Sequence, residues 1–381
     1  RQERFQLVQG WKDERERARQ AFEDATGITQ PTENTVVRDW LKEVLPPEDL
    51  KAFPVSPKSG QLSLESNVLK RYDVPELTLL ADWAHYQKLV STYGDSYAAW
   101  IDPVTGRLHP GFKIGGAATT GRYSCNNPNV QNVPRAGFRQ LFIAPPGRVF
   151  IVADYNAMQL RIAALLAGDE AMLHAFDEGL DVHSYTVKLL TGTAIDEVTK
   201  AERQASKAFN FGLIFGLGVK SLIDYARDSY GVTLTYNEAK QKHARWFEVY
   251  FGIKEFQNKQ RRVAERQGYA ETVHHRKVFW RWFGGFRYTV ALNQPVQGTE
   301  AEIMTDAMHL LYERAQPGQH LVNMIHDELI LEVDGDEKSI DSGKRLLHGA
   351  MTEAFLQTFP DAATARLVEA EVGTTWADAK P

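Results

Sequence analysis

The sequence predicts an α+β protein in which helical regions are combined with a small antiparallel sheet. The first hundred residues contain charged and amphipathic segments that are typical of helices. The segment 148–155, RVFIVADY, is almost continuously apolar, as expected of a central, buried strand. Two further apolar segments flank His326 and Asp327 in the pattern of a tight hairpin.

Length and composition indicate a folded protein of two or three lobes. The chain has 381 residues, of which 43% are hydrophobic and 24% charged, and these are ordinary values for a globular protein. Cys125 is the only cysteine, so an intrachain disulfide cannot form and a reducing, cytoplasmic compartment is expected. We expect no membrane span, because the sequence lacks a stretch of roughly 20 uninterrupted apolar residues.

The charge distribution indicates a polyanionic partner. The formal net charge is −5, but residues 254–288 contain nine basic residues against three glutamates, a local balance of +6. A basic stretch on an acidic body suits a localised track for a polyanion. The alternative is a charged, solvated helix over 253–267.

Proline and glycine divide the N-terminal region into helices. Gly27 ends the first, Pro46 and Pro47 stop the second, and Pro75 opens the last and longest. The helices are expected at 1–26, 36–45, 64–72 and 76–100.

Between residues 101 and 134 the Gly, Asn and Pro content indicates extended, loop-rich backbone. This region places polar side chains on exposed loops, and turn formation is the alternative role for its asparagines. These polar residues are Arg122, Asn129, Gln131 and Asn132.

The apolar strand delivers Asp154 at its end, before a helix that reaches Gly168. A carboxylate at a strand end is a recurrent catalytic placement, although helix N-capping is an equally ordinary role for Asp. Later, Asp327 and Glu328 form an acidic pair at the hairpin turn. A helix at 338–359 and a closing strand at 365–372 complete the chain.

Residues 201–218 are the most informative segment. Two cations and two aromatic rings recur there every four residues, so on a helix they form one stripe. The stripe consists of Arg203, Lys207, Phe211 and Phe215. Cations hold phosphates and a ring can receive a nucleobase, so the stripe predicts a nucleotide-binding helix. The alternative is a solvated Arg and Lys face on a helix whose Phe residues enter the core. Against it, the core contacts could come from residues largely off the stripe, which would leave both rings free; these are Ala205, Ala208, Phe209 and Ile214.

Two other places hold candidate polar residues. His183 is either a phosphate contact or an ordinary residue near a helix start. Asn293 and Gln297 lie four residues apart, and therefore on one face of a helix expected at 293–315.

Three motifs occur in order: DYNAMQLR at 154–161, the pattern Arg203, Lys207, Phe211, Gly212, Gly216, and IHDE at 325–328. Five further segments accompany them: TGRYSCNNPNVQNVP, DVH, GYAET, NQPVQGTEAE and EVGTTWADA. Together they resemble family A DNA polymerases of the bacterial DNA polymerase I type, polymerase module only. The resemblance implies a right-hand architecture with an antiparallel-sheet palm and helical fingers and thumb. Its parts would be a thumb at 1–110, which includes the start of the palm, the palm at 111–167 and 289–381, and fingers at 168–288.

The resemblance also implies roles for individual residues. The catalytic residues would be Asp154, Asp327, Glu328 and Lys207. Two Mg²⁺ ions, with Mn²⁺ as a substitute, would be held by Asp154, Asp327 and the backbone carbonyl of Tyr155. The nucleotide would contact Arg203, Lys207, Phe211, His183, Gln159 and Phe215. The DNA duplex would contact Arg122, Asn129, Gln131, Asn132, Arg139, Asn293, Gln297 and His326.

Three positions depart from the family pattern. Gln159 stands where Glu is usual, Phe215 where Tyr is usual, and Thr289 where Arg is usual, with Arg287 as a substitute for that Arg. In the family the Glu excludes a ribose 2′-hydroxyl. We therefore expect a gate that is present but less firmly fixed, and a preference for deoxynucleotides that is less strict.

The expected function is template-directed addition of deoxynucleoside monophosphates to a primer 3′-hydroxyl, with release of pyrophosphate and without a proofreading domain in this chain. The expected partners are primer–template DNA and deoxynucleoside triphosphates, with no membrane, and the chain is expected to be a monomer. A two-metal nuclease or phosphatase is an alternative, but it has no need of the stripe. A non-catalytic DNA-binding module is disfavoured, because Asp154, Asp327 and Glu328 would repel phosphate in the absence of metal.

Overall fold

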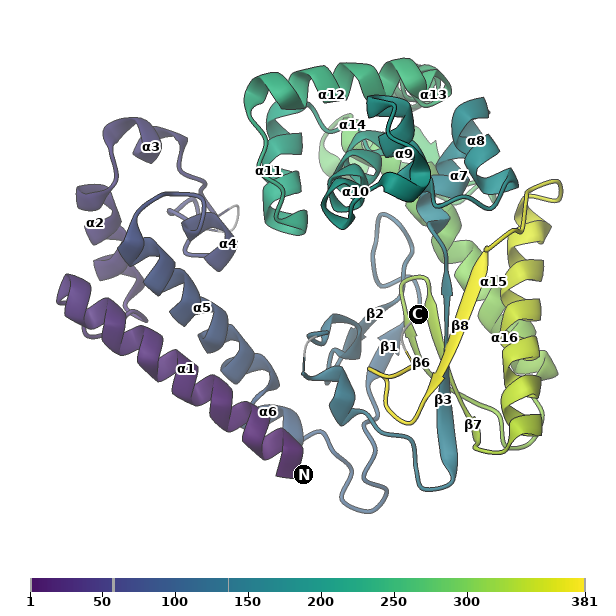
Figure 1. Ribbon diagram of the computed structural model, residues 1–381, viewed down its shortest axis with the longest axis horizontal. Coiled ribbons are helices and arrows are strands. Elements are labelled where there is room, and N and C mark those ends of the chain that lie inside the picture. The colour runs from purple at the N-terminus through teal and green to yellow at the C-terminus, as the bar shows by residue number, and fades with distance from the viewer. Residues whose placement is uncertain (1, 57–58, 136, 380–381) are drawn as a thin grey trace. The chain divides into compact units, whose positions relative to one another are not determined.

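The computed structural model describes residues 2–56, 59–135 and 137–379. The chain forms two compact units (Figure 1). The first unit contains the residues up to Gly111 together with Asn127–Leu141. The second unit contains Phe112–Asn126 and the chain from Phe142 onward.

The first unit is helical, as predicted, but the single helix expected at 76–100 is wrong, because two helices meet there at Gly94. Its helices are α1 (Gln2–Thr26), α2 (Asn34–Val44), α3 (Pro47–Ala52), α4 (Ser66–Leu69), α5 (Pro75–Tyr93) and α6 (Asp95–Ala98), with the 3₁₀ turns η1 (Val130–Asn132) and η2 (Arg139–Leu141). The helices α1 and α5 pack along each other. Gly27, at φ 76°, ends α1, and Pro75 opens α5 at its first turn. The core of this unit is apolar and includes Phe22, Leu41 and Leu77.

The second unit is built on a four-stranded sheet whose neighbouring strands are all antiparallel. Its order is β6 (His320–Ile325), β7 (Glu328–Asp334), β3 (Arg148–Tyr155) and β8 (Val368–Gly373). The interior of β3 is buried from Phe150 to Ala153, which explains its almost continuous apolar sequence. The predicted central strand and the predicted hairpin around His326 and Asp327 are therefore confirmed.

Two long helices lie beside this sheet. The helix α16 (Glu337–Thr358) packs against β3, β7 and β8, and α15 (Thr299–Arg314) packs on α16 (Figure 1). Close approach of α16 depends on Gly343, because a Cβ there would lie 2.6 Å from the Cδ1 atom of Ile151.

Further helices and two small sheets complete the second unit. These helices are α7 (Met158–Ala167), α8 (Glu170–Asp177), α9 (Val182–Thr191), η3 (Ile195–Glu197), α10 (Lys200–Ile214), α11 (Val219–Tyr230), α12 (Tyr236–Val249), α13 (Phe251–Gln267), η4 (Trp280–Phe283) and α14 (Tyr288–Asn293). Two small sheets pair β1 (Gly111–Lys113) with β2 (Ser124–Asn126) and β4 (Tyr269–Glu271) with β5 (Lys277–Phe279). In the part of the chain that the structure describes, no helix has the length and apolar character needed to cross a membrane.

The prediction of a single regular helix at 293–315 is wrong at its start. Between α14 and α15 the chain forms a π-helical segment, η5 (Gln294–Gly298). Pro295 lies in this segment and has no backbone N–H to donate, so the ordinary hydrogen-bond ladder of an α-helix cannot continue through it. The wider turn carries Gln297 and leads directly into α15.

Candidate active site

Two aspartates meet at one end of the central strand. Asp154 is the penultimate residue of β3, and Asp327 lies in the turn between β6 and β7. The backbone N–H of Tyr155 donates to the carbonyl oxygen of Asp327 at 3.1 Å, which ties the turn to the end of β3. The structure thus brings together two residues that are 173 positions apart in the sequence.

Acidic residues flank Asp154 on both neighbouring strands. In register, Asp154 lies opposite Glu328 of β7 and opposite Glu369 of β8. Directly opposed residues of antiparallel strands place their Cβ atoms roughly 4.5–5.5 Å apart. Like charges at this spacing repel one another, so these carboxylates need hydrogen-bond donors or positive charge close by.

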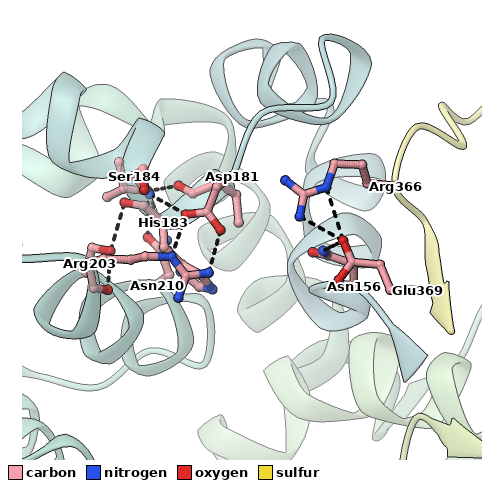
Figure 2. A network of polar contacts seen from close by, with 11 residues as sticks. Asn156, Asp181, His183, Ser184, Arg203, Asn210, Arg366 and Glu369 are labelled. Atoms are coloured by element: carbon pink, nitrogen blue, oxygen red, sulfur yellow. Dashed lines mark hydrogen bonds and ion pairs between the residues drawn. The ribbon is translucent and has the colours of Figure 1, made fainter. Parts of the chain in front are cut away.

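The two flanking glutamates have donors of their own. Glu328 is 3% exposed and accepts a hydrogen bond from Trp376 Nε1 at 2.8 Å. Glu369 accepts from Asn156 Nδ2 at 3.0 Å and from the guanidinium of Arg366 at 2.8 Å (Figure 2). These bonds fix both carboxylates beside Asp154.

The available ligands fit Mg²⁺. Mg²⁺ prefers oxygen ligands and is usually held by one or two carboxylates, with water and substrate phosphates completing its coordination. Asp154 and Asp327 supply two carboxylates, and Tyr155 supplies a carbonyl oxygen beside them. Within the described ranges, groups of three or more His, Cys, Asp or Glu side chains placed to hold a metal are absent. Two carboxylates suit an ion that shares its coordination with a substrate.

The predicted nucleotide-binding helix is α10, and its start is firmly fixed. Thr199 and Glu202 form a capping box: the N–H of Glu202 donates to Thr199 Oγ1 at 3.2 Å, and the N–H of Thr199 donates to Glu202 Oε2 at 2.9 Å. The buried face of α10 includes Ala208, Phe209 and Ile214, as predicted.

The stripe on α10 is half-buried along its whole length, from Arg203 to Phe215. Phe211 and Phe215 are not free of the core, because both pack against its edge. Gly216, at φ 77°, follows the helix, and a Cβ there would lie within 2.8 Å of the side chains of Leu292 and Tyr288. The side chains of Tyr288 and Leu292 therefore occupy the space beside Gly216.

Arg203 is held by Asp181. Its Nη2 lies 2.6 Å from Asp181 Oδ2 and its Nε donates to Oδ1 at 3.0 Å (Figure 2). Asp181 also caps α9 by accepting from the N–H of Ser184 at 2.8 Å. Burial opposes ionisation, but the hydrogen bonds from Arg203 and Ser184 hold the pKa of Asp181 well below its usual range. A nucleotide phosphate would have to compete with this carboxylate for Arg203.

Hydrogen bonding fixes the protonation of His183. The indole N–H of Trp246 can only donate, and it faces Asn210 Oδ1 at 2.8 Å. Asn210 Nδ2 therefore faces His183 Nδ1, at 3.1 Å, and donates to it (Figure 2). Burial lowers the pKa of His183 to about 3, so the ring is neutral at pH 7 and carries its proton on Nε2. Asn210 was not among the site residues predicted from the sequence.

The structure also reveals a partner for Gln159. Its Nε2 donates to Glu300 Oε1 at 3.1 Å, and the guanidinium of Arg122 pairs with the same carboxylate. Arg122 Nη1 lies 3.5 Å from Gln297 Oε1. The expectation that the amide of Gln159 is held less firmly has to be corrected, because a buried carboxylate anchors it.

His326 lies in the hairpin turn with a positive φ of 56°. Burial lowers its pKa, and the nearby charge of Arg122 lowers it further. Asn293, in the second unit as well, has a side-chain oxygen that is enclosed and, within the described residues, makes no hydrogen bond.

The remaining predicted duplex contacts lie in the first unit. Asn129 Oδ1 accepts from the N–H of Gln131 at 3.0 Å and caps η1, which confirms its turn-forming role. Gln131 and Arg139 are 9% and 6% exposed, so the expectation that Gln131 lies on an exposed loop is wrong. The carbonyl oxygen of Asn132 accepts from the hydroxyl of Tyr93 at 2.5 Å. The proposed DNA contacts of these four residues stay predictions.

Comparison with known proteins agrees with this geometry. The chain is 33% identical over 306 residues to DNA polymerase I of Aquifex aeolicus, covering 79% of this chain and 51% of that protein. It is 32% identical over 358 residues to the thermostable DNA polymerase I of Thermus thermophilus, covering 87% and 41%. The chain thus spans about half, or less, of the length of these curated relatives.

A solved structure is similar over almost the whole chain. It is the POL domain of Pol1 from M. smegmatis in complex with DNA primer-template and dNTP, with a TM-score of 0.83 and 25% identity. The similarity covers 99% of this chain and 66% of that one. Residues 6–378 match the model of DNA polymerase family A. With the α+β fold, the paired aspartates and the stripe on α10 all in place, the chain belongs to DNA polymerase family A.

Proposed function

We propose that the chain catalyses template-directed DNA synthesis, joining deoxynucleoside monophosphates to a primer 3′-hydroxyl with release of pyrophosphate. The observation that carries this proposal is the meeting of Asp154 and Asp327 at the end of β3. The partners are then primer–template DNA and deoxynucleoside triphosphates, the molecules named with the similar Pol1 structure.

Family A polymerases use divalent metal ions, and we propose Mg²⁺ here, with Mn²⁺ as a substitute. Asp154, Asp327 and the carbonyl of Tyr155 would hold two ions, and Glu328 would support them from β7. Bound Mg²⁺ would lower the pKa of the primer hydroxyl and neutralise charge on the leaving pyrophosphate. Repulsion among the carboxylates at this sheet end is relieved by the same positive charge.

The side chains of α9 and α10 then bind the triphosphate. Lys207 and Arg203 place positive charge at its phosphates, and Lys207 would act catalytically as charge develops on the leaving group. His183, with its proton on Nε2, would donate a hydrogen bond to a phosphate oxygen. Phe211 would pack on the incoming sugar and base, and Phe215 would stack at the template position.

The duplex would contact the polar residues of both units. In the second unit these are Arg122, Asn293, Gln297 and His326, and in the first unit Asn129, Gln131, Asn132 and Arg139. We assign the thumb to 1–110, the palm to 111–167 and 289–381, and the fingers to 168–288. Minor-groove acceptors are similarly placed in all Watson–Crick pairs, so these contacts would test base-pair geometry without reading sequence.

Primer extension with Mg²⁺ and four deoxynucleotides tests the proposal. Asp154→Ala and Asp327→Ala should each abolish extension while duplex affinity stays close to that of the unmodified chain, because the aspartates hold metal and not DNA. Asp334→Asn is the matched control, since this exposed carboxylate lies at the other end of β7, where it pairs with Arg148.

Two outcomes would contradict the proposal. Mg²⁺-dependent loss of primer without any extension would favour a nuclease. Duplex binding that survives in the complete absence of extension would favour a binding module.

A further inference from the structure

The side chain of Glu300 is almost completely enclosed, at 1% exposure, near the start of α15. Burying a carboxylate costs free energy unless it is paired and hydrogen-bonded. Both of its oxygens are used: Oε1 accepts from Gln159 Nε2 at 3.1 Å, and Oε2 accepts from Arg122 Nε at 3.1 Å and from Arg122 Nη2. Glu300 therefore connects α7 with the loop between β1 and β2.

This pairing decides which end of the Gln159 amide is engaged. A carboxylate can only accept from Arg122 and from an amide N–H, so Nε2 is the end that faces Glu300. The other end, Oε1, makes no hydrogen bond to any residue that the structure describes. Gln159 thus keeps one fixed orientation and presents an acceptor.

We propose that Glu300 is a positioning residue that fixes the Gln159 amide for discrimination between deoxyribose and ribose. The inference rests on the proposed polymerase function and on Gln159 lying beneath the incoming sugar. A mobile amide would adjust to a 2′-hydroxyl, whereas an anchored amide keeps its volume in one place. Arg122, a proposed duplex contact, pairs with the same carboxylate. Glu300 therefore links Gln159 to Arg122.

The pairing also changes what a carboxylate at position 159 would do. Gln159→Glu in this chain would place two carboxylates at hydrogen-bond distance, at a site where the distance is now 3.1 Å. Repulsion between them would displace the side chain. Restoring a Glu at position 159 therefore requires a simultaneous change at Glu300.

The test measures the ratio of incorporation efficiencies for a deoxynucleotide and its ribonucleotide on one template. Hydrogen bonds to charged groups are the stronger kind, so Glu300→Ala should lower this ratio roughly tenfold. Gln159→Glu alone should lower deoxynucleotide incorporation by a similar factor. The double variant Gln159→Glu with Glu300→Gln exchanges carboxylate and amide, and should restore most of the lost efficiency.

Glu302→Gln is the control. It also removes a negative charge from α15, but Glu302 accepts from Thr272 and does not contact Gln159 or Arg122. Its incorporation ratio should equal that of the unmodified chain. Thermal unfolding of each variant separates a folding defect from a positioning defect, and the exchange variant keeps the test decisive if Glu300→Ala does not fold.

A ratio unchanged in Glu300→Ala, or a double variant no better than Gln159→Glu alone, would overturn the inference. Primer extension by the unmodified chain shows whether such a result concerns only the role of Glu300 or the proposed polymerase function itself. If that chain does not extend a primer at all, the polymerase proposal is wrong and the positioning role of Glu300 falls with it.

Discussion

At the scale of single residues, the protonation of His183 follows from groups that can hydrogen-bond in only one way. The indole of Trp246 donates, so Asn210 must present its oxygen there and its nitrogen to the imidazole. The imidazole is then an acceptor at Nδ1 and a donor at Nε2. Replacing the donor nitrogen of Asn210 with an acceptor oxygen should therefore move the ring proton of His183 from Nε2 to Nδ1.

Asn210→Asp should shift the ring proton of His183 to Nδ1. The new carboxylate should also raise the pKa of His183 from about 3 toward its ordinary range. Nucleotide incorporation should fall and should gain a pH dependence between about pH 5 and pH 8 that the unmodified chain lacks. ¹⁵N NMR of the imidazole reports the proton position directly.

Thr186→Val is the matched control for that experiment. Thr186 accepts from the same Asn210 amide at 2.9 Å, but its hydroxyl does not contact His183. The ring proton should stay on Nε2 in this variant. Identical NMR signals in Asn210→Asp and in the unmodified chain would show that Asn210 does not set the tautomer.

Trp376→Phe should destabilise the second unit. The change removes the donor to the buried carboxylate of Glu328 and leaves that oxygen without this hydrogen bond, at a cost of about 1.5–3 kcal/mol in the free energy of unfolding. Urea denaturation measures the difference. Trp282→Phe serves as control, because Trp282 is 57% exposed and its replacement should have little effect. Equal losses in the two variants would contradict the role given to the indole N–H.

At the scale of elements, α10 has two faces of different kinds. One face includes Ala208, Phe209 and Ile214 and belongs to the core, whereas the stripe remains half-buried. The helix is thus fixed by its apolar face, by its capping box and, at Arg203, by the ion pair with Asp181.

Arg203→Ala and Lys207→Ala should each lower incorporation roughly a hundredfold, the usual loss when one preorganised electrostatic contact is removed. Duplex affinity should not change. Lys200→Ala, at an exposed position in the first turn of the same helix, should behave like the unmodified chain. The measurement is single-nucleotide incorporation beside duplex binding. Normal incorporation by both stripe variants would mean that the stripe is only a solvated face.

At the scale of the whole molecule, the two units have separate apolar cores. Leu77 is fully buried in the core of the first unit, and Leu331 is fully buried in that of the second. Separate cores favour local unfolding of one unit without the other.

Leu77→Ala should speed amide hydrogen exchange in the helices of the first unit, and Leu331→Ala should speed it in β3 and β7. Each change removes a fully buried side chain at a cost of about 2–5 kcal/mol. Exchange measured on peptides from both units distinguishes the two effects. Faster exchange throughout the chain after either substitution would show a single cooperative unit instead.

Much of this architecture could be predicted from the sequence. The strand β3 could be predicted because burial on both faces requires a continuous apolar run. The hairpin could be predicted because two apolar runs enclose a two-residue turn. The interrupted helix at Gln294–Gly298 could not be predicted, since helical periodicity alone does not show where a proline widens the turn.

The partners of the site residues were the hardest to predict. Glu300 lies 141 positions from Gln159, and a glutamate on an amphipathic helix is ordinarily solvated. The role of Asn210 could not be predicted either, because the sequence of a helix does not show which imidazole one of its amide side chains contacts. Such contacts depend on how the elements pack, and sequence periodicity describes only one element at a time.

The capping box at Thr199 and Glu202 fixes the residue at which α10 begins. Because the helix begins at a fixed residue, the angular position of every later side chain follows from its distance along the chain. One residue inserted between Glu202 and Arg203 would turn the stripe by about 100° and point its cations away from their present side. Four inserted residues would return it to within about 40° but carry it about 6 Å along the axis. The number of residues between the capping box and the stripe therefore determines the direction in which the stripe points.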